Sequence, residues 1–150
     1  MYEPHQLQAQ FHQEMLGRLE KLSPSSQAQW GKMDVAQMLA HLATALEETM
    51  TTNKVRQTLL GRIFGKVAKR QVLNKGLAKN MPTLPSIKIA DPKEFQQEKK
   101  RFVQELERFL KGGEAGIRRP SHDFFGRMTP NEWARLQYLH IDHHFRQFRI

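Results

Sequence analysis

The segment QYLHIDHHFRQFRI, residues 137–150, carries three of the seven histidines of the chain. Its spacing of apolar residues is otherwise that of an amphipathic helix. His140 and His144 are four residues apart, so on a helix their imidazoles share one face, one turn apart, as two ligands of one metal ion would. His143 points away from that direction. Because two ligands rarely hold a metal ion, we expect a third from another part of the chain.

The composition indicates one folded domain, and we predict that residues 1–150 form it. No apolar run approaches the roughly 20 residues that a membrane-spanning helix needs. The first residues lack the pattern of a secretory signal, so we expect a cytoplasmic location. The chain has no cysteine, which excludes disulfides, thiolate ligands and a cysteine nucleophile. Any metal ion would therefore be bound by nitrogen and oxygen atoms.

The spacing of apolar residues predicts an all-α fold with four main helices and no convincing strand. We expect these helices at residues 3–22, at residues 35–51, from Asp91 to residues 112–113, and from Thr129 to the end of the chain. Asp34 with Gln37 predicts a capping box at the start of the second helix, and Thr129 with Glu132 begins the last one in the same way. Asp91 is the expected N-cap of the third.

A long basic connection, residues 52–89, lies between the second and third helices. Between Thr49 and Ala90 there is no acidic residue, and nine of the 24 lysines and arginines occur there. The other 15 equal the number of acidic residues, so this segment accounts for the formal net charge of +9. Val55, Leu59, Ile63 and Val67 indicate an amphipathic helix within it. A connection of this length can cross from one end of a helical bundle to the other.

His41 lies at the border of the apolar face of the second helix. A lone histidine there is most simply one that bonds to a carbonyl at the edge of the core. Together with His140 and His144, however, it can complete a set of three nitrogen ligands. Zinc and nickel both bind neutral imidazole, and a catalytic site commonly keeps three protein ligands and one open position. Water or a substrate thiol would be activated at that position.

Ligand histidines usually donate their other N–H to a polar group nearby. Helix position suggests four partners for this role: Gln37, Gln137, Asp142 and Gln147. Ile141 stands where the H-E-x-x-H motif of zinc peptidases has glutamate, so a peptidase is disfavoured.

Three stretches, residues 30–42 (WGKMDVAQMLAHL), 122–133 (HDFFGRMTPNEW) and 137–148 (QYLHIDHHFRQF), resemble the DUF1569 group of the DinB/YfiT-like superfamily. The resemblance implies a four-helix bundle of up-down-down-up topology with a long crossover between helices 2 and 3. It also implies a divalent metal ion, nickel or zinc, bound by His41, His140 and His144. Characterised members of the superfamily include metal-dependent transferases and isomerases that use low-molecular-weight thiols. Asp123 departs from the proline expected after His122.

These observations leave several functions open. The first is a metal-dependent enzyme, a thiol-dependent transferase or a hydrolase, that acts on a small-molecule substrate. Glu48, about two turns from His41, is a candidate base, although a surface salt bridge is its simpler role. His143 is interpreted as a surface residue or one that supports a ligand, and His122 has no assigned role.

The alternative is a non-enzymatic binding module whose basic segment, residues 52–89, contacts nucleic acid, an anionic membrane or an acidic partner. Nucleic acid is disfavoured because Phe64 is the only aromatic residue there for base stacking. The segment could equally mark a homodimer surface or an anionic cosubstrate. A third hypothesis is a bundle that has kept its fold and lost its chemistry, with the histidines merely packed.

Overall fold

The computed structural model describes residues 4–53 and 55–150, with the side chains of residues 4–7 left out. Lys54, one of the nine basic residues of the connection, therefore lies outside the described residues. The described chain forms five α-helices: α1 (Pro4–Leu19), α2 (Val35–Thr49), α3 (Leu59–Lys75), α4 (Phe95–Gly116) and α5 (Pro130–Gln147). A short 3-10 helix η1 (Pro85–Ile87) and the strands β1 (Ser121–His122) and β2 (Gly126–Arg127) complete it. The all-α prediction is confirmed, although the two-residue strands, which pair antiparallel, were not predicted.

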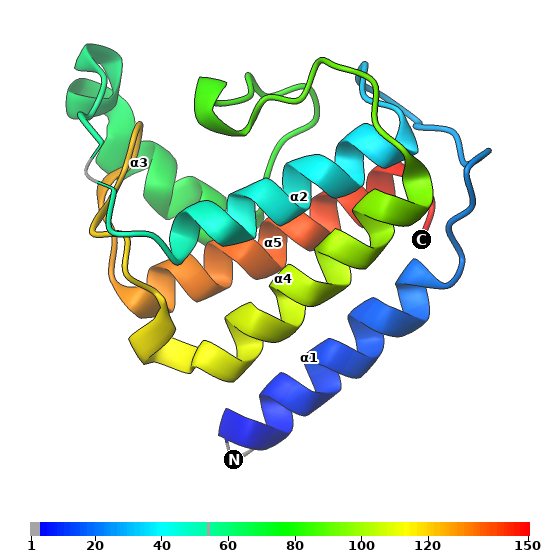
Figure 1. Ribbon diagram of the computed structural model, residues 1–150. Helices are drawn as coiled ribbons and strands as arrows, with labels where there is room; N and C mark the ends of the chain where they lie inside the picture. Colours follow the sequence, from blue (N-terminus) through cyan, green and yellow to red (C-terminus); the bar gives the residue numbers. More distant parts are fainter. Residues whose placement is uncertain (1–3, 54) are drawn as a thin grey trace.

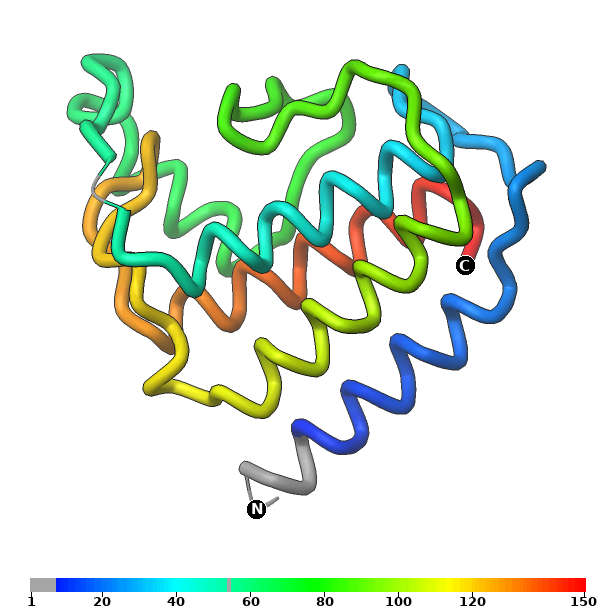
Figure 2. Tube along the Cα trace, viewed as in Figure 1, coloured from blue at the N-terminus to red at the C-terminus, as the bar shows by residue number. Residues whose placement is uncertain are grey.

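Figure 1 shows α1 and α5 running in one direction and α2 and α4 in the opposite one. In the view of Figure 2, α2 lies between α5 and the segment of chain that leads into α4. One apolar core joins all four helices, and its fully buried members include Met15, Leu39, Leu42, Phe102, Leu106 and Phe145. The rings of Phe102 and Phe145 meet edge to face, with 5.8 Å between their centroids. No described helix is both long and apolar enough to cross a bilayer.

Local capping sets the starts of these helices. The capping box of Asp34 and Gln37 on α2 is confirmed, as is that of Thr129 and Glu132 on α5. The predicted N-cap of α4 is wrong, because Glu94 rather than Asp91 accepts hydrogen bonds from the first backbone N–H groups. Asp91 instead forms an ion pair with Lys93 at 2.9 Å.

The connection between α2 and α4 contains α3, so a helix is present there as expected, but it begins at Leu59 and leaves Val55 outside. Thr58 caps it by accepting a hydrogen bond from the backbone N–H of Gly61. Gly61 and Gly65 lie against the backbone of Phe124, where a Cβ on either glycine would collide with the carbonyl oxygen. The chain then returns through η1, which contacts α2. This return brings the backbone of Ile87 to His41.

Candidate metal centre

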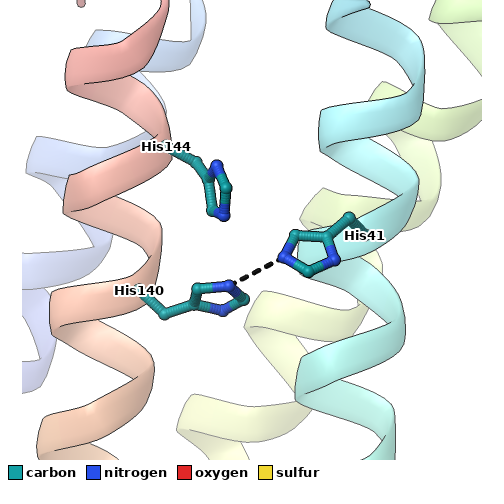
Figure 3. A group of neighbouring side chains, drawn as sticks. All are labelled: His41, His140 and His144. Atoms are coloured by element: carbon teal, nitrogen blue, oxygen red, sulfur yellow. Dashed lines mark hydrogen bonds between the residues drawn. The ribbon is translucent and has the colours of Figure 1, made fainter. Parts of the chain in front are cut away.

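Three histidines converge between α2 and α5. His41 comes from the middle of α2, while His140 and His144 project from successive turns of α5 toward it (Figure 3). One ring nitrogen from each residue can be chosen so that all three lie within 4.8 Å of one another. His41 and His144 are buried, and His140 is partly exposed. The arrangement is that of a three-nitrogen site between the two helices.

The hydrogen bonds of two rings fix which nitrogen faces the centre. His41 Nδ1 lies 2.7 Å from the carbonyl oxygen of Ile87, so this nitrogen carries the proton and donates. His144 Nδ1 lies 2.7 Å from Gln147 Oε1. Gln147 Nε2 in turn donates to the carbonyl oxygen of Trp30 at 2.6 Å, which fixes the orientation of the amide. Both imidazoles therefore direct the lone pair of Nε2 inward, as metal ligands held by outer partners do.

His140 completes the set through a direct contact between rings. Its Nε2 lies 2.8 Å from Nε2 of His41 (Figure 3). Because His41 carries its proton on Nδ1, His140 must donate from Nε2 in this state. Tetrahedral zinc with bonds of about 2.0–2.1 Å separates its nitrogen ligands by about 3.3 Å. Binding would thus require this pair to open slightly and the proton of His140 to leave Nε2.

The surroundings keep these rings neutral. Burial lowers the pKa of His41, although its hydrogen bond to Ile87 partly opposes that shift. Burial, with the neighbouring His41 and His144, holds the pKa of His140 well below its ordinary value. Burial also lowers the pKa of His144 to about 3. Neutral imidazole is the form that binds metal ions, so the donor set fits zinc or nickel near pH 7.

Of the four polar residues suggested as partners of the rings, Gln147 contacts His144. The other three bond elsewhere. Gln37 Oε1 accepts a hydrogen bond from the backbone N–H of Asp34, and its Nε2 donates to the carbonyl of Asp91. Gln137 donates to Thr49 Oγ1 at 2.9 Å. Asp142 pairs with Arg18 at 2.8 Å and with Arg146 at 3.0 Å. The partner that sequence reasoning missed is the carbonyl of Ile87. A backbone acceptor 46 residues from His41 leaves no side-chain signal in the sequence.

The comparison with known families agrees with the three stretches that surround these histidines. The family model described as "Protein of unknown function (DUF1569)" matches residues 1–150. The chain belongs to the DUF1569 family. No curated protein and no solved structure matches it. The function of this DUF1569 protein is therefore inferred from the geometry of its own side chains.

His143 of the DUF1569 protein is buried, so of its two interpretations, a surface residue or one that supports a ligand, the first is wrong. Its ring meets Trp30 edge to face at 5.6 Å and lies 5.0 Å from the ring of His144. Burial lowers the pKa of His143 as well. Trp30 also lies beneath Lys79, whose Nζ is 4.6 Å from the ring centroid. His143 therefore packs between the rings of Trp30 and His144, next to the three-histidine set.

Glu48 belongs to a different cluster, centred on the buried Arg119. The guanidinium of Arg119 pairs with Glu48 at 3.4 Å, contacts the carboxylate of Asp123 and donates to the carbonyl of Ser121. A salt bridge is thus the observed role of Glu48. Asp123, which replaces an expected proline, offsets the charge of this buried arginine. The described contacts of both carboxylates lie outside the three-histidine set.

His122 is a structural acceptor in the hairpin between α4 and α5. Its Nδ1 accepts hydrogen bonds from the backbone N–H groups of Phe124 and Phe125, both at 3.0 Å. Its ring stacks on that of Phe125 with 4.3 Å between centroids. Burial lowers the pKa of His122 to about 4. The neutral ring is therefore part of the fold rather than of the candidate metal site.

This pKa predicts acid sensitivity at one residue. The folded-state pKa of His122 lies below the unfolded value of 6.5, so the unfolded chain binds more protons between these two values. The contribution of His122 to the free energy of unfolding is therefore present above pH 6.5 and is lost as the pH falls toward 4. The loss approaches about 3 kcal/mol for a shift of this size. His122→Asn keeps an acceptor without the titration. We expect urea unfolding to show a smaller stability loss between pH 7 and pH 4 for this variant than for the wild type, whereas equal losses would contradict the assignment.

Gln147 provides a test of how the histidine rings of the candidate site are held. Gln147→Leu removes the acceptor for His144 Nδ1, so that ring is free to turn or change tautomer. We expect zinc affinity, measured by competition with a chromophoric chelator, to fall about 10–100-fold. Gln137→Leu is the matched control, since Gln137 is equally buried on α5 and bonds to Thr49 instead. Equal losses in the two variants would mean that Gln147 acts only through packing.

Proposed function

We propose that this protein is a divalent-metal-dependent enzyme of the DinB-like superfamily, with His41, His140 and His144 as the metal ligands. The observation that carries the proposal is the approach of three ring nitrogens, one from each residue, to within 4.8 Å. The proposal includes a four-helix bundle of up-down-down-up topology, with residues 52–89 as its crossover. The directions of α1, α2, α4 and α5 in Figure 1 support that topology.

Zinc or nickel bound by these residues would act as a Lewis acid and favour the ionised form of a thiol or water at its open position. The protein supplies three neutral nitrogens, with Ile87 and Gln147 fixing two of the rings. We place the small-molecule substrate on the side of His140, the one residue of the three that is not classed as buried. His41 and His144 are both buried, which limits the access of bulk water to their rings.

A low-molecular-weight thiol suits the described residues better than carboxylate-assisted hydrolysis. Glu48, the carboxylate considered as a base, is engaged by Arg119. A free thiol has a pKa of about 8.5, so its ionisation needs little help from a protein base. The chain itself has no cysteine, so the thiol would come from a co-substrate. We therefore propose a transferase-like reaction in which the thiol is the nucleophile.

Elemental analysis of protein purified without a histidine tag tests the metal directly. We expect about one zinc or nickel ion per chain, because the three histidines form one site. Absence of stoichiometric metal, together with no rise in melting temperature when zinc or nickel is added, would contradict the proposal.

Cobalt substitution tests the thiol separately. Because the chain lacks cysteine, any thiolate-to-metal charge-transfer absorption must come from an added thiol. We expect such a band when a panel of low-molecular-weight thiols is titrated into the cobalt form, and none with the matched alcohols. A metal-loaded protein that shows no band with any thiol would retain the metal site and remove the thiol from the proposal.

A further inference from the structure

The surface of helix α3 has three faces: one packed on the protein, one apolar and exposed, and one basic. The inward face consists of small or buried residues at spacings of three and four, namely Gly61, Gly65, Ala68 and Val72. The glycines permit close contact with the backbone of Phe124. Lys69 adds an ion pair with Glu132 of α5 at 2.7 Å. These contacts fix which side of α3 turns toward the protein.

The outward face of α3 is apolar, and none of the residues that the structure describes covers it. Five large side chains between 56% and 75% exposed form it, and we call them the α3 apolar face: Leu59, Leu60, Ile63, Phe64 and Val67. Elsewhere in the described part of the chain, the large exposed apolar side chains are Met81 and Tyr138. Contiguous apolar surface of this kind marks a protein or membrane interaction site. Figure 1 places α3 at an edge of the molecule, where such a surface is accessible.

A basic stripe runs beside this face. Arg62, Lys66 and Arg70 follow one another at intervals of four residues, and all three are exposed. The sequence from residue 50 to residue 89 contains no acidic residue to neutralise them. The uncovered side of α3 therefore combines an apolar strip with an adjacent row of positive charges. This combination is typical of helices that lie in the plane of an anionic membrane surface.

We propose that α3 docks this protein on the surface of an anionic lipid bilayer. The α3 apolar face would enter the boundary between headgroups and acyl chains, and Arg62, Lys66 and Arg70 would meet the anionic headgroups. Nucleic acid would satisfy the charges but leave the apolar side chains in water. A second copy would cover the apolar side chains but place its own basic stripe close to the first. A bilayer satisfies both features, and none of the three histidines takes part.

Vesicle co-sedimentation tests this docking. We expect binding to phosphatidylcholine vesicles that contain phosphatidylglycerol and little binding to phosphatidylcholine alone. The double variant Ile63→Ser/Phe64→Ser should bind more than tenfold more weakly, because it removes two apolar side chains that would enter the bilayer. Each of Arg62→Gln and Lys66→Gln should weaken binding about fivefold. Tyr138→Ser, which changes an exposed aromatic residue on α5, should bind as the wild type does.

A fluorescent label distinguishes insertion of the α3 apolar face into the bilayer from simple attraction between charges. Phe64→Cys creates the single cysteine of the chain, and an environment-sensitive fluorophore on it should shift to the blue with anionic vesicles. The same label at Tyr138→Cys should not shift. No vesicle binding at low salt, or binding that the serine double variant retains in full, would overturn the proposal. If the protein does not bind vesicles but self-associates, and the serine double variant abolishes this self-association, the membrane proposal is overturned in favour of a second copy.

Discussion

His144→Ala is expected to abolish stoichiometric binding of zinc or nickel. The substitution leaves His41 and His140 as the only nitrogens of the set, and two ligands rarely hold a metal ion. We expect the affinity to fall by more than about 100-fold, beyond the loss expected for an outer partner such as Gln147. The measurement is metal content after dialysis, followed by competition with a chelator of known affinity. His41→Ala and His140→Ala should behave in the same way.

The control for this experiment is His12→Ala. His12 lies on α1 and faces Glu107 at 3.7 Å, so its removal changes the histidine count without changing the set. A tight ligand also stabilises the folded state, by about 4 kcal/mol when its concentration is 1,000 times its Kd. The wild type and His12→Ala should show this rise in unfolding free energy, and His144→Ala should not. Unchanged metal content in His144→Ala would favour a fold whose histidines are merely packed.

The parts of the site that depend on local spacing could be predicted from the sequence. His140 and His144 share a helix face because they are four residues apart, and the capping boxes of α2 and α5 join residues three apart. The N-cap of α4 was predicted wrongly because Asp91 and Glu94 are both suitable acceptors. Local pattern does not decide between them. In the structure, Asp91 is engaged by Lys93, and its carbonyl accepts a hydrogen bond from Gln37.

Long-range contacts could not be predicted in the same way. The carbonyl of Ile87 reaches His41 only because the chain returns over α2. No side-chain pattern in the sequence predicts this return. For α3, the spacing of Leu59, Ile63 and Val67 predicts that they share one face of the helix. Spacing does not predict whether another part of the protein covers that face. The close packing of Gly61 and Gly65 on the backbone of Phe124 determines the orientation of α3, and the apolar residues therefore face outward. Spacing thus identifies which residues share a face, and tertiary packing determines its surroundings.

Phe102→Ala is expected to destabilise the metal-free protein by about 3–5 kcal/mol, the usual cost of removing a buried aromatic side chain. Phe102 is fully buried on α4, and its ring meets that of Phe145 on α5, which follows His144. The cost should appear as a lower midpoint in urea unfolding. Phe64→Ala is the matched control, because Phe64 is 56% exposed and the substitution should change stability by about 0.5 kcal/mol or less.

Metal binding should restore much of the stability that Phe102→Ala loses. Phe102 lies outside the three-histidine set, so a zinc concentration of 1,000 times Kd should stabilise the variant by about 4 kcal/mol. In the double variant Phe102→Ala/His144→Ala, the core loss should remain and the zinc effect should disappear. Additivity is expected because the two substitutions remove separate interactions, one apolar and one metal-binding. Equal stabilisation of the single and double variants by zinc would show that the ion binds elsewhere and would remove His144 from the site.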